Sequence, residues 1–349
     1  MGIHDDPYGT SAAPACAWPA ESCPPVPDPD AARAGSAALA PVLPLRPHGS
    51  RVDGVPLFCV SGEAGPAWSF AHLITELDAR TPVYGLQSVP GADGTLADIV
   101  AGFLAEIHRI APAGPCRLLG WSAGGFVAHE LAVALHEAGR DVSVMLLATD
   151  PATCADPPPA AWTVGEYIHR FGALLGLDTG AGMLDVPRGD DAATAGFEAP
   201  AVDFGADTAG LEAAAMAFDT DIAGYGGANA ALAADAAAAA LTAVLAGTVD
   251  FTGPDLDLLA DASHAALRRV AGHRPSLLPG DLTVCVAGRN GDGTDIADPG
   301  AAVRNWRPYA TGTVTGILLD ATPAELLGPE LSGEIARALE STPPAARTI

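Results

Sequence analysis

A serine flanked by glycines carries the clearest chemical potential in this sequence. The pentapeptide GWSAG, residues 120–124, fits the pattern G-x-S-x-G, in which the serine occupies a tight turn from a strand into a helix. An apolar run precedes the motif, and residues 123–138 have helical spacing and end before a glycine. At a helix N-terminus, N–H groups without a helical partner stabilise negative charge on a nearby oxygen. We therefore predict that Ser122 is a nucleophile and that the amide of Ala123 is one donor of an oxyanion hole.

An acidic residue closes the next predicted strand. VSVMLLATD, residues 142–150, is a buried-strand pattern that ends in Asp150. The carboxyl ends of parallel strands share one edge of a sheet, so Ser122 and Asp150 are expected to face the same crevice. Two structural alternatives stay open from the residues alone. The glycines also suit a turn that packs a helix onto a sheet, and Asp150-Pro151 also suits an ordinary turn.

Strands and helices alternate around these two residues. Four buried-strand patterns are interleaved with amphipathic helical segments, and the alternation predicts a mostly parallel α/β sheet with helices on both faces. The pattern resumes with two further strands and a terminal helix near the C-terminus. The expected strands are 56–62, 81–87, 117–121, 142–150, 281–288 and 313–320, and the expected helices are 67–77, 95–111, 123–138 and 329–341.

Two segments differ from this alternation. Residues 1–45 are rich in Pro, Ala and Asp and have no apolar period, so we expect a flexible arm or linker before a single domain over 46–349. From about Pro151 to Pro275 alanine-rich helical segments replace the strands. We predict that this block is a large helical lid insertion over the sheet, lining a roomy, apolar cavity.

The composition excludes several classes of protein. With 17 Lys and Arg against 42 Asp and Glu, the net charge is −25, which disfavours nucleic acid and anionic membranes as partners. No apolar run is long enough to span a membrane and no leader is evident, so the expected location is the cytoplasm. The six cysteines are scattered without metal-ligand spacing, which predicts free thiols and no metal site.

Residues 42–150 resemble the thioesterase domains of nonribosomal peptide and polyketide synthases. The resemblance rests on the segments VLPLRPHGS, PLFCV, TPVYGLQ, GWSAGG and AHELAVAL followed by LLATD. It implies an α/β-hydrolase fold with a helical lid and a Ser-Asp-His triad. It also implies release of an acyl or peptidyl chain from a phosphopantetheinyl carrier protein, by hydrolysis or cyclisation, with no cofactor beyond the arm of that partner.

Two stretches depart from the family pattern. Where the family has a His-Pro pair after its first strand, this sequence has Ser61-Gly62-Glu63, and we expect the backbone N–H of Glu63 to serve as the second oxyanion donor. The catalytic histidine is expected in the phrase LLDATPAELLGPEL. The alignment there places Pro323, or else Thr322, at the position of the base, and neither accepts a proton.

Three interpretations follow from the missing histidine. In the first, a lid histidine, His264 or His169, or an amine of the substrate takes the proton of Ser122. In the second, the chain is a degenerate domain that binds carrier-tethered acyl chains without turning them over. In the third, the pocket hosts another reaction, and the loop carboxylates are Asp292, Asp295 and Asp320. The remaining histidines are expected to be structural: His4, His48, His72, His108, His129, His136 and His273.

An acidic carrier protein would need a local positive patch on so acidic a chain. Two groups of arginines are candidates, although ordinary solvated side chains are an equal alternative. They are Arg268-Arg269 with Arg274, and Arg304 with Arg307.

Overall fold

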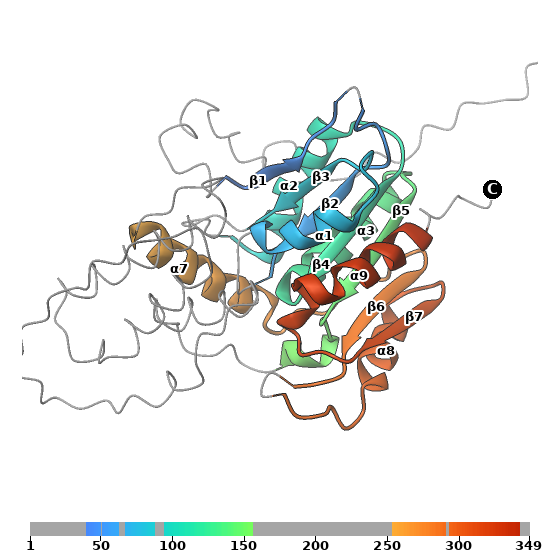
Figure 1. Cartoon of the computed structure of the whole chain (residues 1–349). Coiled ribbons are helices and arrows are strands. Elements are labelled where there is room, and N and C mark those ends of the chain that lie inside the picture. The colour runs from blue at the N-terminus through green and yellow to red at the C-terminus, as the bar shows by residue number, and fades with distance from the viewer. Residues whose placement is uncertain are drawn as a thin grey trace, which may run out of the picture. The chain divides into compact units, whose positions relative to one another are not determined.

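The fold is built on one seven-stranded sheet. A computed structural model describes residues 40–49, 51–62, 67–87, 94–155, 253–290 and 293–342. The strands follow the order β1-β3-β2-β4-β5-β6-β7, and helices cover both faces of the sheet (Figure 1). All neighbouring strands pair in parallel except β1, which is antiparallel to β3. The predicted α/β architecture with a mostly parallel sheet is therefore confirmed.

The strands lie close to where the apolar runs predict them. They are β1 (Val42–Arg46), β2 (Leu57–Val60), β3 (Val83–Leu86), β4 (Cys116–Trp121), β5 (Val142–Leu147), β6 (Leu282–Ala287) and β7 (Val314–Leu319). The helices are α1 (Ala71–Glu76), α2 (Leu96–Ile110), α3 (Ala123–Glu137), α7 (Gly253–Val270), α8 (Gly300–Trp306) and α9 (Pro329–Ser341). Short 3₁₀ turns complete the list: η2 (Ala67–Phe70), η3 (Pro151–Ala155), η5 (Arg307–Tyr309) and η6 (Glu325–Leu327).

Two apolar cores lie on the two faces of the sheet. Successive strand residues point to opposite faces, so Leu57 and Cys59 of β2 belong to one core and Phe58 and Val60 to the other. Helices α1 and α9 cover the first face, and α2, α3 and α8 cover the second (Figure 1). Because both faces are buried, the central strands read as continuous apolar runs rather than as alternating patterns.

The start of the fold differs from the sequence-based boundary. Strand β1 begins at Val42, inside the segment predicted to be an arm, and the fold therefore starts a few residues before position 46. The single antiparallel pairing with β3 explains why a short strand that contains a proline occurs here, since an edge strand tolerates a missing N–H donor. Residues 1–39 lie outside the described residues.

The predicted lid is described at its two ends. Turn η3 and helix α7 belong to it, and residues 156–252 lie outside the described residues. The described residues between β5 and β6 add no strand to the sheet, as the sequence predicts. Helix α7 packs against α3, the helix that follows the serine. None of the helices in the described part of the chain is long and apolar enough to cross a membrane.

The cysteines that the structure describes are buried free thiols. Burial raises the pKa of the Cys116 thiol to about 11 and that of the Cys285 thiol to about 12, so neither thiol ionises near neutral pH. Cys59 and Cys154 are buried as well. This agrees with the predicted free thiols inside apolar strands, while Cys16 and Cys23 lie outside the described residues.

Candidate functional site

The turn at Ser122 has the backbone strain that the motif predicts. Ser122 lies between β4 and α3 with φ = 50° and ψ = −122°, a conformation that L-residues rarely adopt. Such a conformation costs about 1–3 kcal/mol and persists only where neighbouring groups hold it. The Ser122 amide donates to the Leu147 carbonyl at 2.9 Å, and the Ser122 carbonyl accepts from the Gly125 amide at 2.9 Å. The end of β5 therefore holds the strained turn in place.

The glycines around Ser122 allow backbone-to-backbone packing. A Cβ atom added at Gly120 would lie 2.5 Å from the Cα of Gly125. One added at Gly124 would meet the Ser61 carbonyl oxygen, and it would lie 2.5 Å from that of Val60. The first turn of α3 thus packs directly on β4 and on the end of β2. The glycines therefore allow the tight helix packing that accompanies the strained turn.

Ala123 and the residues that precede Glu63 lie on either side of this contact. Ala123 is buried in the first turn of α3. On the other side, the Ser61 amide is committed to the sheet, because it donates to the Leu86 carbonyl at 2.9 Å. A Cβ atom added at Gly62 would lie 2.5 Å from the Trp121 ring, so the chain leaves β2 in contact with the residue before the serine. The next residue, Glu63, lies outside the described residues.

Asp150 follows β5, the strand that pairs with the serine strand. Trp121 and Leu147 are paired in the β4–β5 register, which brings Ser122 and Asp150 to neighbouring strand ends. The Thr149 hydroxyl donates to the Ser122 carbonyl at 3.1 Å and joins the two ends directly. The Asp150 carboxylate accepts from the side-chain amide of Asn305, at 2.9 Å for Oδ1 and 3.2 Å for Oδ2. The Ala152 amide also donates to Oδ1, at 2.9 Å.

The loop after β7 lies next to the serine turn. The Trp121 indole N–H donates to the Pro323 carbonyl at 3.0 Å, so the residue aligned with the missing histidine does reach this site. Thr322 and Glu325 form reciprocal hydrogen bonds, with the Thr322 amide 2.7 Å from Glu325 Oε2 and the Glu325 amide 3.4 Å from the Thr322 hydroxyl. These two hydrogen bonds close the short turn that leads into η6.

Ion pairs with Arg289 also stabilise the loop after β7. The hydrogen bonds from Thr322 and the Arg289 guanidinium, 3.4 Å from Glu325 Oε2, lower the pKa of Glu325. Arg289 also lies 3.1 Å from Asp320 Oδ1. The loop that should carry the catalytic histidine is therefore a closed turn with its polar groups paired.

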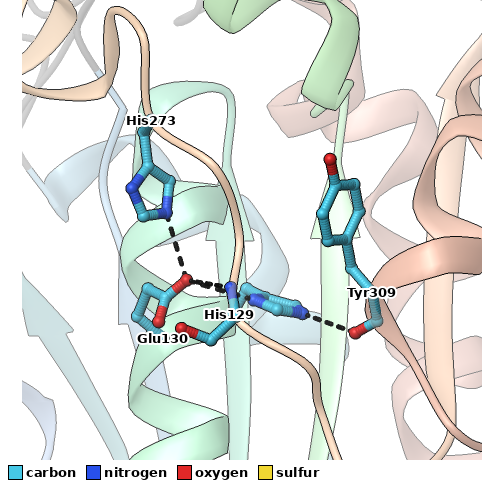
Figure 2. A network of polar contacts seen from close by, with 5 residues as sticks. His129, Glu130, His273 and Tyr309 are labelled. Atoms are coloured by element: carbon cyan, nitrogen blue, oxygen red, sulfur yellow. Dashed lines mark hydrogen bonds and ion pairs between the residues drawn. The ribbon is translucent and has the colours of Figure 1, made fainter.

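Two histidines contact Glu130 of α3 in the polar network shown in Figure 2: His129 lies on α3 itself, and His273 follows α7. His273 Nε2 lies 3.1 Å from Glu130 Oε1, and His129 Nδ1 lies 3.7 Å from the same oxygen. The fully buried His129 also donates through Nε2 to the Tyr309 carbonyl at 3.3 Å. Burial alone would raise the pKa of Glu130, but its contacts with both histidines and its hydrogen bond from the Ser276 amide outweigh burial and lower that pKa. These contacts give both histidines a structural role.

His264 lies on the helix that passes the serine turn. One turn earlier on α7, Ala260 joins the apolar cluster that contains Trp121 and Ala321. His264 itself is half-buried, and its Nδ1 atom is buried without a hydrogen-bond partner among the described residues. The second candidate base, His169, lies outside the described residues.

A small cavity lies between α7 and the serine turn. It has a volume of about 10 Å³, which is the space of one water molecule. Apolar side chains of α2, α3 and α7 line it together with Ser61, Ala123 and Arg269. Apart from α7, the alanine-rich segments from which we predict a roomy cavity lie outside the described residues.

The other predicted site residues are spread over the surface. The Asp320 side chain is 93% exposed, Asp295 lies in the loop after β6, and Asp292 is not among the described residues. Of the arginines, Arg304 is paired with Asp298, and the Arg269 side chain donates to the Gly94 carbonyl at 3.1 Å. The remaining arginines of the two groups, Arg268, Arg274 and Arg307, are exposed. Within the described ranges, His, Cys, Asp and Glu form no group able to hold a metal ion.

Sequence reasoning missed the helix that binds Asp150. Asn305 and Trp306 end α8, and the Trp306 indole N–H donates to the Thr149 carbonyl at 2.8 Å. The Asn305–Asp150 contact joins residues 155 positions apart, which no spacing rule connects. A lone tryptophan in the short stretch RNWRPY is the local signal that a buried anchor lies here.

The family comparison identifies the serine-bearing segment. The family model described as "Thioesterase domain" matches residues 55–170, about a third of the chain. Malpinin synthetase of Mortierella alpina is 40% identical over 116 residues, which cover 32% of this chain and 2% of that protein. The dimodular nonribosomal peptide synthase of Bacillus subtilis is 38% identical over 115 residues, covering 32% and 5%. The matched segment thus spans a small part of each relative, and the predicted resemblance is confirmed over it.

Solved structures extend the likeness to the whole fold. The Vlm2 thioesterase domain superposes with a TM-score of 0.58 at 16% identity, covering 87% of this chain and 98% of that one. The four-domain nonribosomal peptide synthetase AB3403 gives a TM-score of 0.56 at 18% identity, covering 88% of this chain and 20% of that one. At such low identity these matches establish the α/β-hydrolase fold of thioesterase domains and nothing finer.

Proposed function

We propose that this chain, in which residues 55–170 match the thioesterase domain, is an acyl-handling enzyme with Ser122 as its nucleophile. Its substrate is an acyl or peptidyl chain held as a thioester on the phosphopantetheinyl arm of a carrier protein, and the product leaves by hydrolysis or cyclisation. One of the relatives named above is a nonribosomal peptide synthase and the other is a malpinin synthetase, which supports this substrate class.

The strained turn at Ser122 is the observation that carries the proposal. A φ of +50° on a serine destabilises the fold locally. The hydrogen bonds with Leu147, Gly125 and Thr149 and the close packing at Gly124 hold this conformation in place. Ser122 is the N-cap residue of the fifteen-residue helix α3, and its strand β4 pairs with β5, the strand that Asp150 follows. A turn that merely packs a helix onto a sheet needs the glycines but gains nothing from a serine at this position.

The proposed chemistry is acyl transfer through a covalent intermediate. The Ser122 oxygen attacks the thioester carbonyl, a C–O bond forms, and the hydroxyl proton passes to a base. The tetrahedral oxyanion is stabilised by the Ala123 amide and by the amide of Glu63. Collapse breaks the C–S bond, the thiol of the carrier arm leaves with a proton, and water or a nucleophile of the substrate itself then takes the acyl group from Ser122.

His264 is the base that we propose among the described histidines. Its support is its position on α7, between Ala260, which belongs to the Trp121 cluster, and Ala266, which lines the cavity at Ala123. The buried Nδ1 atom has no partner among the described residues, as expected for a group that acquires one with substrate. His169 and an amine of the substrate remain the alternatives, and His264→Gln should slow acylation while added imidazole restores it.

The alternative function is a binding domain without turnover. One observation favours it: the Pro323 carbonyl accepts a hydrogen bond from the Trp121 indole beside the serine turn, and the loop around Pro323 is closed by its own hydrogen bonds. Such a domain would hold carrier-tethered acyl chains at the Ser122 site and leave the thioester intact.

Covalent labelling separates the two functions. We would incubate the whole chain with a fluorophosphonate probe, and separately with an acyl-pantetheine thioester, and measure its intact mass. The proposed enzyme gains one adduct, Ser122→Ala abolishes the gain, and Ser341→Ala at the end of α9 retains it as a matched control. No adduct at any pH, or an equal adduct in Ser122→Ala, would overturn the proposed enzyme and leave the binding domain.

The carrier protein is the proposed partner. Arg268 and Arg274 are exposed near the end of α7, close in sequence to the cavity residues Ala266 and Val270. Reversing both charges to Glu should raise the KM for a carrier-linked substrate and leave that for a free acyl-pantetheine unchanged. Equal KM values for the carrier-linked substrate in the variant and the wild type would exclude this patch.

A further inference from the structure

We infer that Asn305 is the positioning residue for the acid of this site, holding the Asp150 carboxylate toward the serine turn through its side-chain amide. The inference rests on the proposed function, because it gives Asn305 a role through Asp150. It concerns α8, a helix that neither the G-x-S-x-G motif nor the thioesterase match at residues 55–170 includes.

The geometry of the contact fixes the orientation of the amide. Both oxygens of Asp150 lie within hydrogen-bond distance of Asn305 Nδ2, at 2.9 and 3.2 Å. A carboxylate only accepts hydrogen bonds, so the NH₂ end of the side chain must face it. Together with the Ala152 amide on Oδ1, this amide limits the carboxylate to one orientation. A neutral amide donates to the carboxylate but cannot take a proton from Ser122, so Asn305 does not replace the missing base.

The next residue anchors the amide to the same strand end. Trp306 is fully buried and its indole N–H donates to the Thr149 carbonyl at 2.8 Å. The Thr149 hydroxyl in turn donates to the Ser122 carbonyl at 3.1 Å. Asn305 therefore binds the Asp150 carboxylate directly, and Trp306 is linked to the serine turn through Thr149.

The other side of Trp306 packs on the helix that follows the serine. Its ring centroid lies 4.8 Å from that of His129 and 5.8 Å from that of Phe126, both on α3. The end of α8 is thus fixed between α3 and the end of β5, which restricts the position of Asn305. Asn305 is half-buried, whereas its neighbours Arg304 and Arg307 on the same turn are exposed.

Two substitutions test the inference with opposite chemistry. Asn305→Leu keeps the approximate size and removes the donor, so it should lower the maximal rate of Ser122 labelling about 10- to 100-fold, as expected for one hydrogen bond to a charged group. Asn305→Asp keeps the shape and adds a second carboxylate beside Asp150. The acid limb of its pH–rate profile should move up by about one pH unit or more, because two adjacent carboxyls resist double ionisation.

The control is the same charge change elsewhere. Asn290 lies in the exposed loop after β6 and donates to the Thr294 hydroxyl at 2.9 Å, so Asn290→Asp alters the net charge without touching Asp150. Thermal unfolding of each variant confirms that it is folded. If Asn305→Leu fails to fold, the near-isosteric Asn305→Asp carries the test through its pH profile, which a purely structural role would leave unchanged.

The possible results separate this inference from the proposed function. Slow labelling in Asn305→Leu and a shifted profile in Asn305→Asp, with Asn290→Asp unchanged, support it. Wild-type rates and profiles in both Asn305 variants, while Ser122→Ala stays unlabelled, overturn it and leave the proposed function intact. If the wild type itself is not labelled, the proposed function fails. A crystal structure of Asn305→Leu tests the geometry without any labelling: an Asp150 carboxylate that keeps its wild-type position would overturn the inference.

Discussion

Replacing Gly124 with alanine tests how tightly the first turn of α3 packs against β2. The added Cβ atom would meet the Ser61 carbonyl oxygen and would lie 2.5 Å from the Val60 carbonyl oxygen. Ordinary van der Waals contacts of a Cβ begin near 3.4 Å, and both obstacles are backbone atoms of the core strand β2 and the residue after it. Something in the sheet or the helix must therefore move, which costs about 1–3 kcal/mol of unfolding free energy.

Gly102→Ala is the matched control for this substitution. Gly102 lies on the exposed face of α2, and an added Cβ atom there meets nothing within 4 Å. The same change should stabilise the chain by about 0.4–1 kcal/mol, because alanine restricts the unfolded chain more than glycine does. The two substitutions thus have opposite predicted signs.

Urea unfolding measures both free energies, and the rate of probe labelling reports on the turn itself. We expect Gly124→Ala to unfold at lower urea concentration and, under conditions where it is still folded, to label more slowly than Gly102→Ala. If Gly124→Ala matched Gly102→Ala in stability and in labelling rate, the close approach of α3 to β2 would be refuted. The packing account of the strained turn would then fail with it.

Three other substitutions probe the surroundings of the site. Glu130→Gln should lower the free energy of unfolding at neutral pH, because a carboxylate whose folded-state pKa is lowered stabilises the fold above its unfolded pKa of about 4.5 and loses this effect as pH falls. Urea unfolding curves of the variant and the wild type should therefore differ at pH 7 and converge in acid. A difference that stays constant with pH would contradict this. Trp306→Phe keeps an aromatic ring, although a smaller one, and leaves the buried Thr149 carbonyl without its donor, so it should cost about 1–3 kcal/mol of unfolding free energy in the same assay. A cost near zero would show that this contact does not anchor α8. Pro323→His, made in a His264→Gln background, should speed labelling by about 100-fold, since the Trp121 bond to the backbone at 323 is kept and an imidazole returns to the expected position. No gain would mean that position 323 does not face Ser122.

Most of the sheet was predictable because each strand carries its own signal. The runs LFCV, CRLLGW and VSVMLL are buried on both faces, so local hydrophobicity alone identifies them. The serine turn was predictable for the same reason, since GWSAG needs only its own neighbours to be recognised. Strand β1 was harder, because VLPLR is an edge strand with a proline and follows directly on a segment without an apolar pattern.

The support of the site depends on contacts between distant residues. Asn305 binds Asp150 across 155 positions, and Trp121 binds the Pro323 carbonyl across 202. Neither pairing leaves a local pattern, because a hydrogen bond between separate elements depends on the strand order of the sheet. The alignment of LLDATPAELLGPEL predicts Pro323 or Thr322 at the position of the base, but it did not predict the reciprocal Thr322–Glu325 hydrogen bonds that close this loop.

The central claim is that the Ser122 hydroxyl is the reactive acyl acceptor of this chain. Its most direct test is peptide mapping after reaction with an acyl-pantetheine thioester, which locates the acyl group on a single residue. We predict that the acyl group is found on the peptide that contains Ser122 and on no other serine or cysteine. An acyl group mapped to a different residue, or an unmodified Ser122 after prolonged reaction, would contradict the account.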